Sequence, residues 1–445
     1  PEERLQTALV PDWEWPYKLP ENWCWTNWGE CGEFVAGSGF KNEYQGFTNY
    51  DIPFYKVSSL KTANETGYLC DNTNTVDETV RKKLKAALIP ANSLLFAKIG
   101  EAIRLNRRAI NTVPCCVDNN MMAFVPIICQ LKYAFYWSKG IDLYDFTNAT
   151  TVPAIRKTDL EKISFPLAPL AEQQRIVDRI ESLFAKLDEA KEKAQDVVDS
   201  FEIRKAAILH KAFTGELTAK WREEHGVGME SWEKYKFNEL GTLERGRSKH
   251  RPRNDPKLFG GKYPFIQTGD VARSGMYITE HTQTLSEVGA EQSKLFPKGT
   301  LCITIAANIG DVSILTYDCC FPDSVVGFTP NERTLSEYIY YLMSTLQREI
   351  EANAPATAQK NINLRILNDL QLDIPSVAEQ TQIVNQVEYL FFQEQHAKEA
   401  AEAVLEQIDL MKKSILARAF RGELGTNDPS EESAVELLKR GLEKK

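Results

Sequence analysis

The sequence predicts an α+β protein in which two mixed α/β modules are separated by a long antiparallel two-helix coiled coil. An internal tandem repeat with a pseudo-twofold arrangement is the basis of this prediction. The phrase AEQQRIVDRIESLF (171–184) returns as AEQTQIVNQVEYLF (378–391). The offset of 207 residues then holds without a gap to residues 217 and 424, and about 21 of the 47 aligned pairs are identical. Each half is therefore expected to be one globular module followed by one long helix.

Weaker similarity upstream of the helices places the two modules at residues 1–168 and 218–375. The first module contains Trp23, Gly32 and CCVDNNMMAFVP (115–126), and the second contains Trp232, Gly241 and CCFPDSVVGFTP (319–330). Runs rich in β-branched and aromatic residues predict strands, namely LLFAKI, MMAFVPII, LCITIA and VVGFTP. The segments KYAFYWSK and SEYIYYLMSTLQREIEA are expected to be helical. Each module should thus have a mostly β core.

The long helices are predicted at residues 169–217 and 376–424. Pro169 and Glu172 suit a helix start, because proline fits the first turn and a carboxylate favours the positive end. Gly215 and Gly422 suit the two ends. Apolar residues recur between these signals at alternating spacings of three and four, which is a heptad pattern.

Two seams of matched length predict that the helices pack on each other rather than each on its own module. A helix of about 40 residues would span roughly 60 Å. The expected seam, which also marks the surface for partner docking, consists of Ile176, Ile180, Leu183, Leu187, Val197 and Phe201 in the first helix and Ile383, Val387, Leu390, Val404, Ile408 and Met411 in the second. Residues 425–445 are predicted to form a tail that packs near the N-terminus, with a helix cap around Asp428.

Composition excludes several classes of protein. The net charge of −9 argues against a surface that binds nucleic acid everywhere, although it allows local basic patches. No apolar run reaches the length of a membrane span, and the first residues contain no secretory core, so we expect a cytoplasmic protein. The nine cysteines form no C-x-x-C pair and the five histidines show no metal spacing, which predicts reduced thiols and no metal site.

The strongest candidate for a DNA contact is the basic segment 241–262, whose glycines and prolines predict a loop. Its candidate phosphate contacts are Arg245, Arg247, Lys249, Arg251, Arg253 and Lys257. Weaker candidates in the first module are Lys98, Arg104, Arg107 and Arg108. Polar groups in expected loops could contact base edges, namely Gln267, Thr268, Gln359, Lys360 and Asn361. The alternative is that the basic segment is an ordinary solvated loop and the others are turns or strand decoration.

No catalytic constellation is found in the sequence. GGKY (260–263) lacks the upstream glycine and the Ser/Thr of a phosphate-binding loop. GSGF (37–40) is followed by Asn42 where a dinucleotide-binding fingerprint needs glycine. No proline pair of the kind found in amino-group DNA methylases occurs, and no nuclease, G-x-S-x-G or HExxH pattern is present. We therefore expect a chain that is not itself an enzyme and has no catalytic residues.

The chain resembles the specificity subunits of Type I restriction–modification enzymes. The similarity is carried by PLAPLAEQQRIVDRIESLF (166–184), its repeat at 375–391, and the paired endings AFTGEL and AFRGEL. The second helix start departs from the proline-rich phrase, with IPSVAEQT in its place. The order of parts in that family, a target-recognition domain and a conserved helix followed by a second pair, matches essentially the whole chain.

The resemblance implies a function for each part. Each recognition domain would bind one half of a bipartite site in double-stranded DNA, and the antiparallel helices would set the spacer between the halves. The helices would also dock two methyltransferase (modification) subunits, which restriction subunits join. S-adenosylmethionine and ATP would bind those partner subunits and not this chain.

Two other functions compete with this interpretation. A two-armed scaffold could bind only proteins, without DNA contact, and the acidic net charge favours it slightly. A fused nuclease or methylase is disfavoured by the missing motifs.

Overall fold

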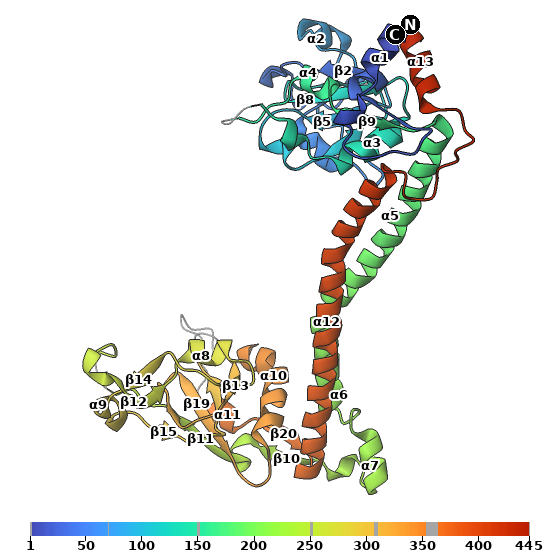
Figure 1. Ribbon diagram of the computed structural model, residues 1–445. Helices are drawn as coiled ribbons and strands as arrows, with labels where there is room; N and C mark the ends of the chain where they lie inside the picture. Colours follow the sequence, from blue (N-terminus) through green and yellow to red (C-terminus); the bar gives the residue numbers. More distant parts are fainter. Residues whose placement is uncertain are drawn as a thin grey trace. The chain divides into compact units, whose positions relative to one another are not determined.

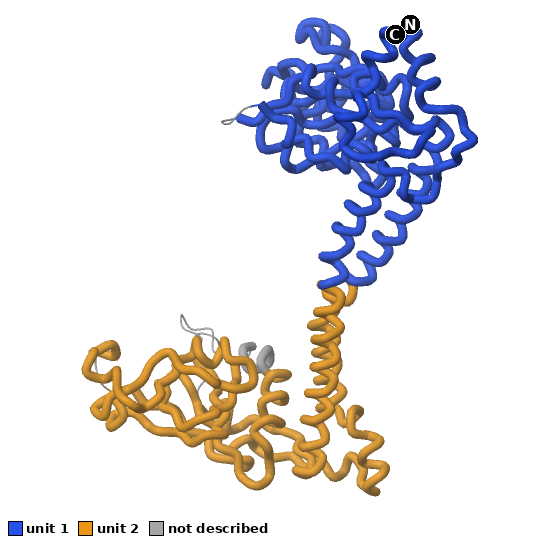
Figure 2. Tube along the Cα trace, in the orientation of Figure 1, with its two compact units in different colours: residues 1–194, 403–445 blue, residues 195–402 orange. Residues whose placement is uncertain are grey.

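The computed structural model describes residues 2–69, 71–148, 152–249, 252–306, 310–352 and 364–444. The chain divides into two compact units (Figure 2). Unit 1 comprises residues 1–194 and 403–445, and unit 2 comprises residues 195–402. Each unit contains one of the globular modules together with a part of each long helix (Figure 1).

The module of unit 1 is built on two small sheets and the separate antiparallel pair β1–β9. One sheet has the order β2-β8-β5-β6, and the other has the order β4-β3-β7. The strands are β1 (Cys24–Asn27), β2 (Gly32–Ala36), β3 (Ile52–Tyr55), β4 (Thr75–Val76), β5 (Leu94–Ala97), β6 (Arg108–Ile110), β7 (Cys116–Val117), β8 (Met121–Pro126) and β9 (Ser164–Leu167). Helix α3 (Leu131–Gly140) packs against β5 and β6 of the first sheet. Its Trp137 contacts Trp28, which lies between β1 and β2, with ring centroids 4.8 Å apart. Strand β5 is buried along its whole length, as its unbroken apolar run predicts.

The module of unit 2 repeats this arrangement, but each of its two main sheets contains one more strand. Its sheets have the orders β11-β19-β16-β17-β13 and β14-β12-β18-β15, and β10 forms a separate antiparallel pair with β20. The strands are β10 (Glu233–Lys236), β11 (Gly241–Arg245), β12 (Phe259–Phe265), β13 (Tyr277–Ile278), β14 (Gln283–Leu285), β15 (Leu295–Phe296), β16 (Leu301–Thr304), β17 (Val312–Leu315), β18 (Cys319–Cys320), β19 (Val325–Pro330) and β20 (Gln371–Ile374). Helix α10 (Ser336–Ala352) packs against β17. The strands and helices expected in both modules are confirmed.

Strand register confirms the tandem repeat at the level of single residues. In unit 1, β3 pairs in parallel with β7 so that Phe54 faces Cys116. In unit 2, β12 pairs in parallel with β18 so that Phe265 faces Cys320. The antiparallel pairs β2–β8 and β11–β19 also correspond. The two modules are therefore versions of one fold.

The first long helix is interrupted, whereas the second is continuous. Helices α5 (Leu170–Asp199) and α6 (Phe201–Phe213) are separated by Ser200, and α12 runs from Val377 to Ala419. Gly215 and Gly422, at the expected ends, have φ angles of +78° and +74°, a region that glycine enters without strain. The remaining helices are α1 (Glu2–Ala8), α2 (Glu78–Lys83), α4 (Lys157–Glu161), α7 (Ala219–His225), α8 (Thr268–Arg273), α9 (Glu287–Glu291), α11 (Leu364–Asn368) and α13 (Ala434–Lys444).

The repeated AEQ phrase attaches each long helix to its module. Gln173 is fully buried; its Nε2 donates to Ala168 O at 2.8 Å, and its Oε1 accepts from Gln130 N at 2.7 Å. Gln380 repeats this in unit 2, where Nε2 donates to Pro375 O at 2.9 Å and Oε1 accepts from Leu335 N at 3.0 Å. Buried amides need such partners, so the glutamine fixes how the helix leaves the module.

The glutamate of the same phrase is also buried in both units, but its donors differ. Glu172 accepts from Trp23 Nε1 at 2.7 Å and from Asn427 Nδ2 at 2.9 Å. Burial raises the pKa of the Glu172 carboxyl group although these hydrogen bonds act to lower it. Glu379 instead accepts from Arg222 Nη1 at 2.6 Å and from Thr218 Oγ1 at 2.7 Å.

Contacts between the long helices occur inside each unit. In unit 1, Lys412 forms an ion pair with Asp188 and lies over the ring of Phe184. In unit 2, Arg204 pairs with Glu394 at 2.5 Å, and Lys205 lies over the ring of Phe391. The offset of 207 residues relates Phe184 to Phe391 and Lys412 to Lys205, so the two cation–ring contacts are equivalent.

The predicted seam is wrong at two positions of α12. Val404 and Met411 are 43% and 46% exposed, whereas Ile408 is buried and the neighbours Leu405 and Lys412 are half-buried. The inward face includes lysine, whose aliphatic stem can cover an aromatic ring while the ammonium group reaches solvent. At these two turns the inward-facing position is therefore one residue later than the heptad pattern predicted.

Segment 425–445 belongs to unit 1. Helix α13 packs against α1, and Arg4 Nη1 donates to Leu442 O at 2.8 Å (Figure 1). Within the described ranges, no helix combines the length and apolar character needed to cross a bilayer.

Candidate nucleic-acid interface

The basic segment 241–262 includes all of β11 and the start of β12, so the prediction of a loop is wrong at both ends of the segment. Two of its arginines contact Asp323. Arg245 Nε donates to the carbonyl oxygen of Asp323, and Arg253 Nη2 donates to its Oδ2 at 2.9 Å. Arg247, Lys249 and Lys257 are exposed. Arg251 lies outside the described residues. The structure thus places several cationic groups at the surface of one segment, as phosphate contacts require.

The candidates in the first module differ in exposure. Arg107 is exposed, whereas Arg104 pairs with Glu101 at 3.0 Å and stacks 3.4 Å from the ring centre of Tyr144. Lys98 is half-buried, and desolvation lowers the pKa of its ammonium group. We therefore keep Arg107 and Arg104 as candidates and regard Lys98 as weaker.

The prediction for Arg108 is wrong, because its side chain is buried in the module. Its Nη2 donates to Asn106 Oδ1 at 2.6 Å and to Ser138 O at 3.1 Å. Burial lowers the pKa of the Arg108 guanidinium group to about 9. Arg108 is the first residue of β6, whose three residues are all buried, whereas Arg107 precedes the strand and is exposed.

A hollow of about 440 Å³ lies beside the basic segment and is lined mainly by polar groups. Two residues predicted from the sequence, Arg253 and Gln267, both line it. Gln267 is exposed at the start of α8, and its Nε2 donates to Gln283 Oε1 at 2.8 Å. The other carboxamides that line the hollow are Asn254 and Gln292. Arginine and amide groups in one concavity suit both phosphate and base-edge contacts.

Of the other polar residues predicted to contact base edges, the structure describes only Thr268. Thr268 is the first residue of α8 and is half-buried. Gln359, Lys360 and Asn361 lie outside the described residues. Gln283 was missed by the sequence prediction, because a single glutamine in a strand gives no compositional signal. Its pairing with Phe265 in β12 places it next to the candidates.

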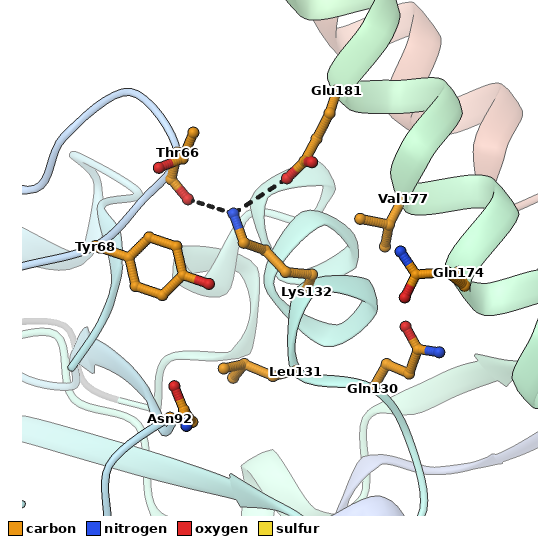
Figure 3. A pocket seen from close by; sticks show the side chains of 9 residues that line it. All are labelled: Thr66, Tyr68, Asn92, Gln130, Leu131, Lys132, Gln174, Val177 and Glu181. Atoms are coloured by element: carbon orange, nitrogen blue, oxygen red, sulfur yellow. Dashed lines mark hydrogen bonds and ion pairs between the residues drawn. The ribbon is translucent and has the colours of Figure 1, made fainter. Parts of the chain in front are cut away.

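A second hollow, of about 520 Å³, lies in unit 1 between the module and α5 (Figure 3). Lys132 reaches into it and donates to Thr66 O at 2.7 Å and to Glu181 Oε1 at 3.1 Å. Its ammonium group also lies 4.7 Å from the ring centre of Tyr68. Because these groups satisfy the charge, this hollow contributes to the attachment of α5 and is a weaker anion site than the basic segment.

The part of the chain that the structure describes contains no group of three or more His, Cys, Asp or Glu residues suited to a metal ion. The cysteines there are buried, and burial raises the pKa of the Cys24 thiol to about 12. Such thiols stay protonated and are poor nucleophiles or ligands at neutral pH.

Comparison with known proteins gives consistent matches over both halves. The sequence model described as "Type I restriction modification DNA specificity domain" matches residues 20–198 and 229–404. The EcoKI specificity subunit of Escherichia coli strain K12 is 26% identical over 287 residues, which are 61% of this chain and 60% of that protein. The EcoBI specificity subunit of E. coli is 24% identical, over 62% of each chain. The matched region is thus less than two thirds of these relatives.

Solved structures give similarity over more of the chain. The crystal structure of the HsdS subunit from Thermoanaerobacter tengcongensis has a TM-score of 0.67 at 19% identity, and the match covers 92% of this chain and 100% of that one. A chain from a study of complex assembly in a Type I R-M system has a TM-score of 0.59 at 18% identity, with 92% of this chain covered. At these identities the similarity establishes the fold.

Proposed function

Because the chain belongs to the Type I restriction modification DNA specificity domain family, we propose that it is the DNA sequence-specificity subunit of a Type I restriction–modification complex. Each module binds one half of a bipartite site in double-stranded DNA. The main support is that one fold occurs twice in the chain with different polar residues at its surface. Two modules of this kind can bind two half-sites of different sequence. The chain itself performs no catalysis in this proposal.

The long helices are proposed to form an antiparallel coiled coil that sets the spacer between the half-sites. The cross-helix contacts inside each unit support this, with Asp188–Lys412 in one and Arg204–Glu394 in the other. Two methyltransferase subunits dock on the helices, and restriction subunits join through them. S-adenosylmethionine and ATP bind these partners and not this chain.

A test of DNA binding follows from the basic segment. We expect the triple variant Arg247→Ala, Lys249→Ala, Arg253→Ala to bind its DNA site more weakly. The slope of log affinity against log salt concentration should flatten by up to about three, because each lost phosphate contact releases about one counterion fewer. Fluorescence anisotropy of a labelled duplex, with the complex of this chain and its methyltransferase, measures both quantities.

A matched control for that variant removes three exposed lysines of unit 2 outside the basic segment, at Lys220, Lys234 and Lys236. The control should retain the wild-type slope. Equal slopes for all three proteins would show that the segment is ordinary solvated surface.

The spacer role can be tested by shortening both helices together. Deletion of residues 186–192 and 408–414 removes one heptad from each, which shortens a helix by about 10 Å while rotating its face by only about 20°. The preferred spacer in the DNA site should shorten by about three base pairs. Selection of bound duplexes with randomised spacer length measures it. An unchanged spacer in a folded, assembled variant would contradict the role.

The second candidate is a scaffold that binds only proteins, and the net charge of −9 favours it. The wild-type complex discriminates between the two functions. Salt-sensitive retardation of duplex DNA supports the specificity subunit, and assembly with the methyltransferase without any DNA retardation supports the scaffold.

A further inference from the structure

We propose that Lys56 in unit 1 and Gln267 in unit 2 are equivalent specificity-determining positions, each contacting a base edge in its own half-site. The inference rests on the proposed function and assigns base recognition in each half-site to a single residue. It starts from the strand register, which aligns the two modules without reference to sequence identity.

Lys56 and Gln267 occupy the same position in the repeated fold. Lys56 stands two residues after Phe54, which pairs with Cys116, and Gln267 stands two residues after Phe265, which pairs with Cys320. Lys56 precedes the 3₁₀ helix Val57–Thr62, and Gln267 precedes α8. The backbone N of Lys56 donates to Ser59 Oγ at 3.1 Å, and that of Gln267 donates to Asp270 Oδ2 at 2.8 Å. The backbone frame is therefore the same in both modules.

The side chains on this common frame differ, but each is held in a similar way. Lys56 Nζ donates to Gln45 Oε1 at 2.9 Å, and Gln267 Nε2 donates to Gln283 Oε1 at 2.8 Å. In each case a glutamine carbonyl holds a nitrogen donor. An ammonium group has three N–H bonds and a carboxamide has two, so each keeps donor capacity for a ligand.

The surroundings of the two positions also correspond. An offset of 209 residues aligns Gly37 with Gly246, and both glycines lie against backbone carbonyls that a Cβ would meet within 2.5 Å. The same offset aligns Gln45 with Asn254, which lines the hollow that contains Gln267. In unit 1 this loop residue, Gln45, bonds to Lys56 directly, whereas in unit 2 the bond to Gln267 comes from Gln283 of β14 and Asn254 lines the same hollow.

The side chains of Lys56 and Gln267 are suited to contact a base, and a role in helix capping does not explain both of them. Lysine cannot accept a hydrogen bond, so the fold does not require a capping side chain at this position. Arg253, a candidate phosphate contact, lines the same hollow as Gln267. A phosphate contact fixes the position of the protein on the duplex, and an amide beside it can then form hydrogen bonds to base edges. Lysine donors favour guanine O6 and N7, and a glutamine amide favours adenine N6 and N7.

Exchange of the two residues tests the proposal. Gln267→Lys should change the preferred base from adenine to guanine at one position of one half-site, and Lys56→Gln should make the reverse change in the other half. We expect discrimination to shift by about 10-fold to 100-fold at that position. Selection from a randomised duplex library by the complex of this chain and its methyltransferase measures both half-sites at once, so the untouched half is an internal control.

Two further variants keep the test independent of folding. Gln267→Glu keeps the size of the side chain but replaces its donor with a carboxylate, and it should abolish the adenine preference. Gln283→Ala should relax selection at the same position, because the amide loses its support. Gln371→Lys, an exposed residue on β20, is the matched control and should select the wild-type site.

The outcomes separate this inference from the proposed function. If the wild-type complex selects no bipartite site, the proposed function fails and this inference fails with it. If the wild-type complex selects a bipartite site and the variants at Lys56 and Gln267 select the same one, only the present inference is overturned. A base change confined to one half-site per variant establishes it.

Discussion

Replacing Glu379 with alanine is expected to lower the free energy of unfolding of unit 2 by about 3–5 kcal/mol, because it leaves a buried cation without its partner. The Glu379 side chain is 1% exposed and that of Arg222 is 8% exposed. Arg222 Nη1 lies 2.6 Å from Glu379 Oε1 and 3.0 Å from Thr218 Oγ1. Its Nη2 donates to Gly215 O. One guanidinium group therefore joins the end of the first long helix, α7 and the start of α12.

Hydrogen exchange detected by mass spectrometry measures this effect separately for each unit. The protection of β10, β20 and the start of α12 should fall in Glu379→Ala, while that of unit 1 stays unchanged. The double variant Glu379→Leu, Arg222→Leu should lose less than the single variant, because no unpaired charge remains. Glu189→Ala, which breaks the exposed pair with Lys193, should leave exchange unchanged. Wild-type protection in Glu379→Ala would contradict the assigned role of the pair.

The repeat explains why sequence alone predicted so much of the fold. Apolar runs such as those of β5 and β16 are buried over their whole length, and their pattern depends only on neighbouring residues. The ends of the long helices are local too, because glycine enters the left-handed region at low cost. The donors to Glu172 and Glu379 could not be predicted in this way. They come from segments far away in the sequence, and the two copies share only a threonine among their donors.

The seam and the candidate interface show two further limits of sequence patterns. Lys412 and Lys398 lie over the rings of Phe184 and Phe201, so charged residues take positions that a heptad pattern assigns to apolar ones. The basic segment could be predicted because charge accumulates there. Lys56 and Gln283 could not be predicted from the sequence. A single polar residue gives no signal there, and only the strand register shows which other residues lie beside it.

Removal of residues 426–445 is expected to destabilise unit 1 severely, since this segment completes its core. Ala434, Leu438 and Leu442 are buried, and burial of two leucines contributes about 3–6 kcal/mol. That is comparable with the whole stability of many domains. The deletion also removes Asn427 and Thr426, two of the three donors to the buried Glu172 carboxylate. The bidentate pair between Arg175 and Glu431, at 2.8 and 2.9 Å, is lost as well.

A point variant tests the same contact without loss of the whole segment. Leu438→Ala should cost about 2–5 kcal/mol, and Glu436→Ala, an exposed residue of the same helix, should leave stability unchanged. Because Ala434 N donates to Asn22 O and Arg4 donates to Leu442 O, the loss should appear first as faster hydrogen exchange in α1 and β1. Unit 2 shares none of these contacts and should keep its exchange rates. If α1 and β1 exchange at the wild-type rate in Leu438→Ala, the segment is an appendage and not a part of the core of unit 1.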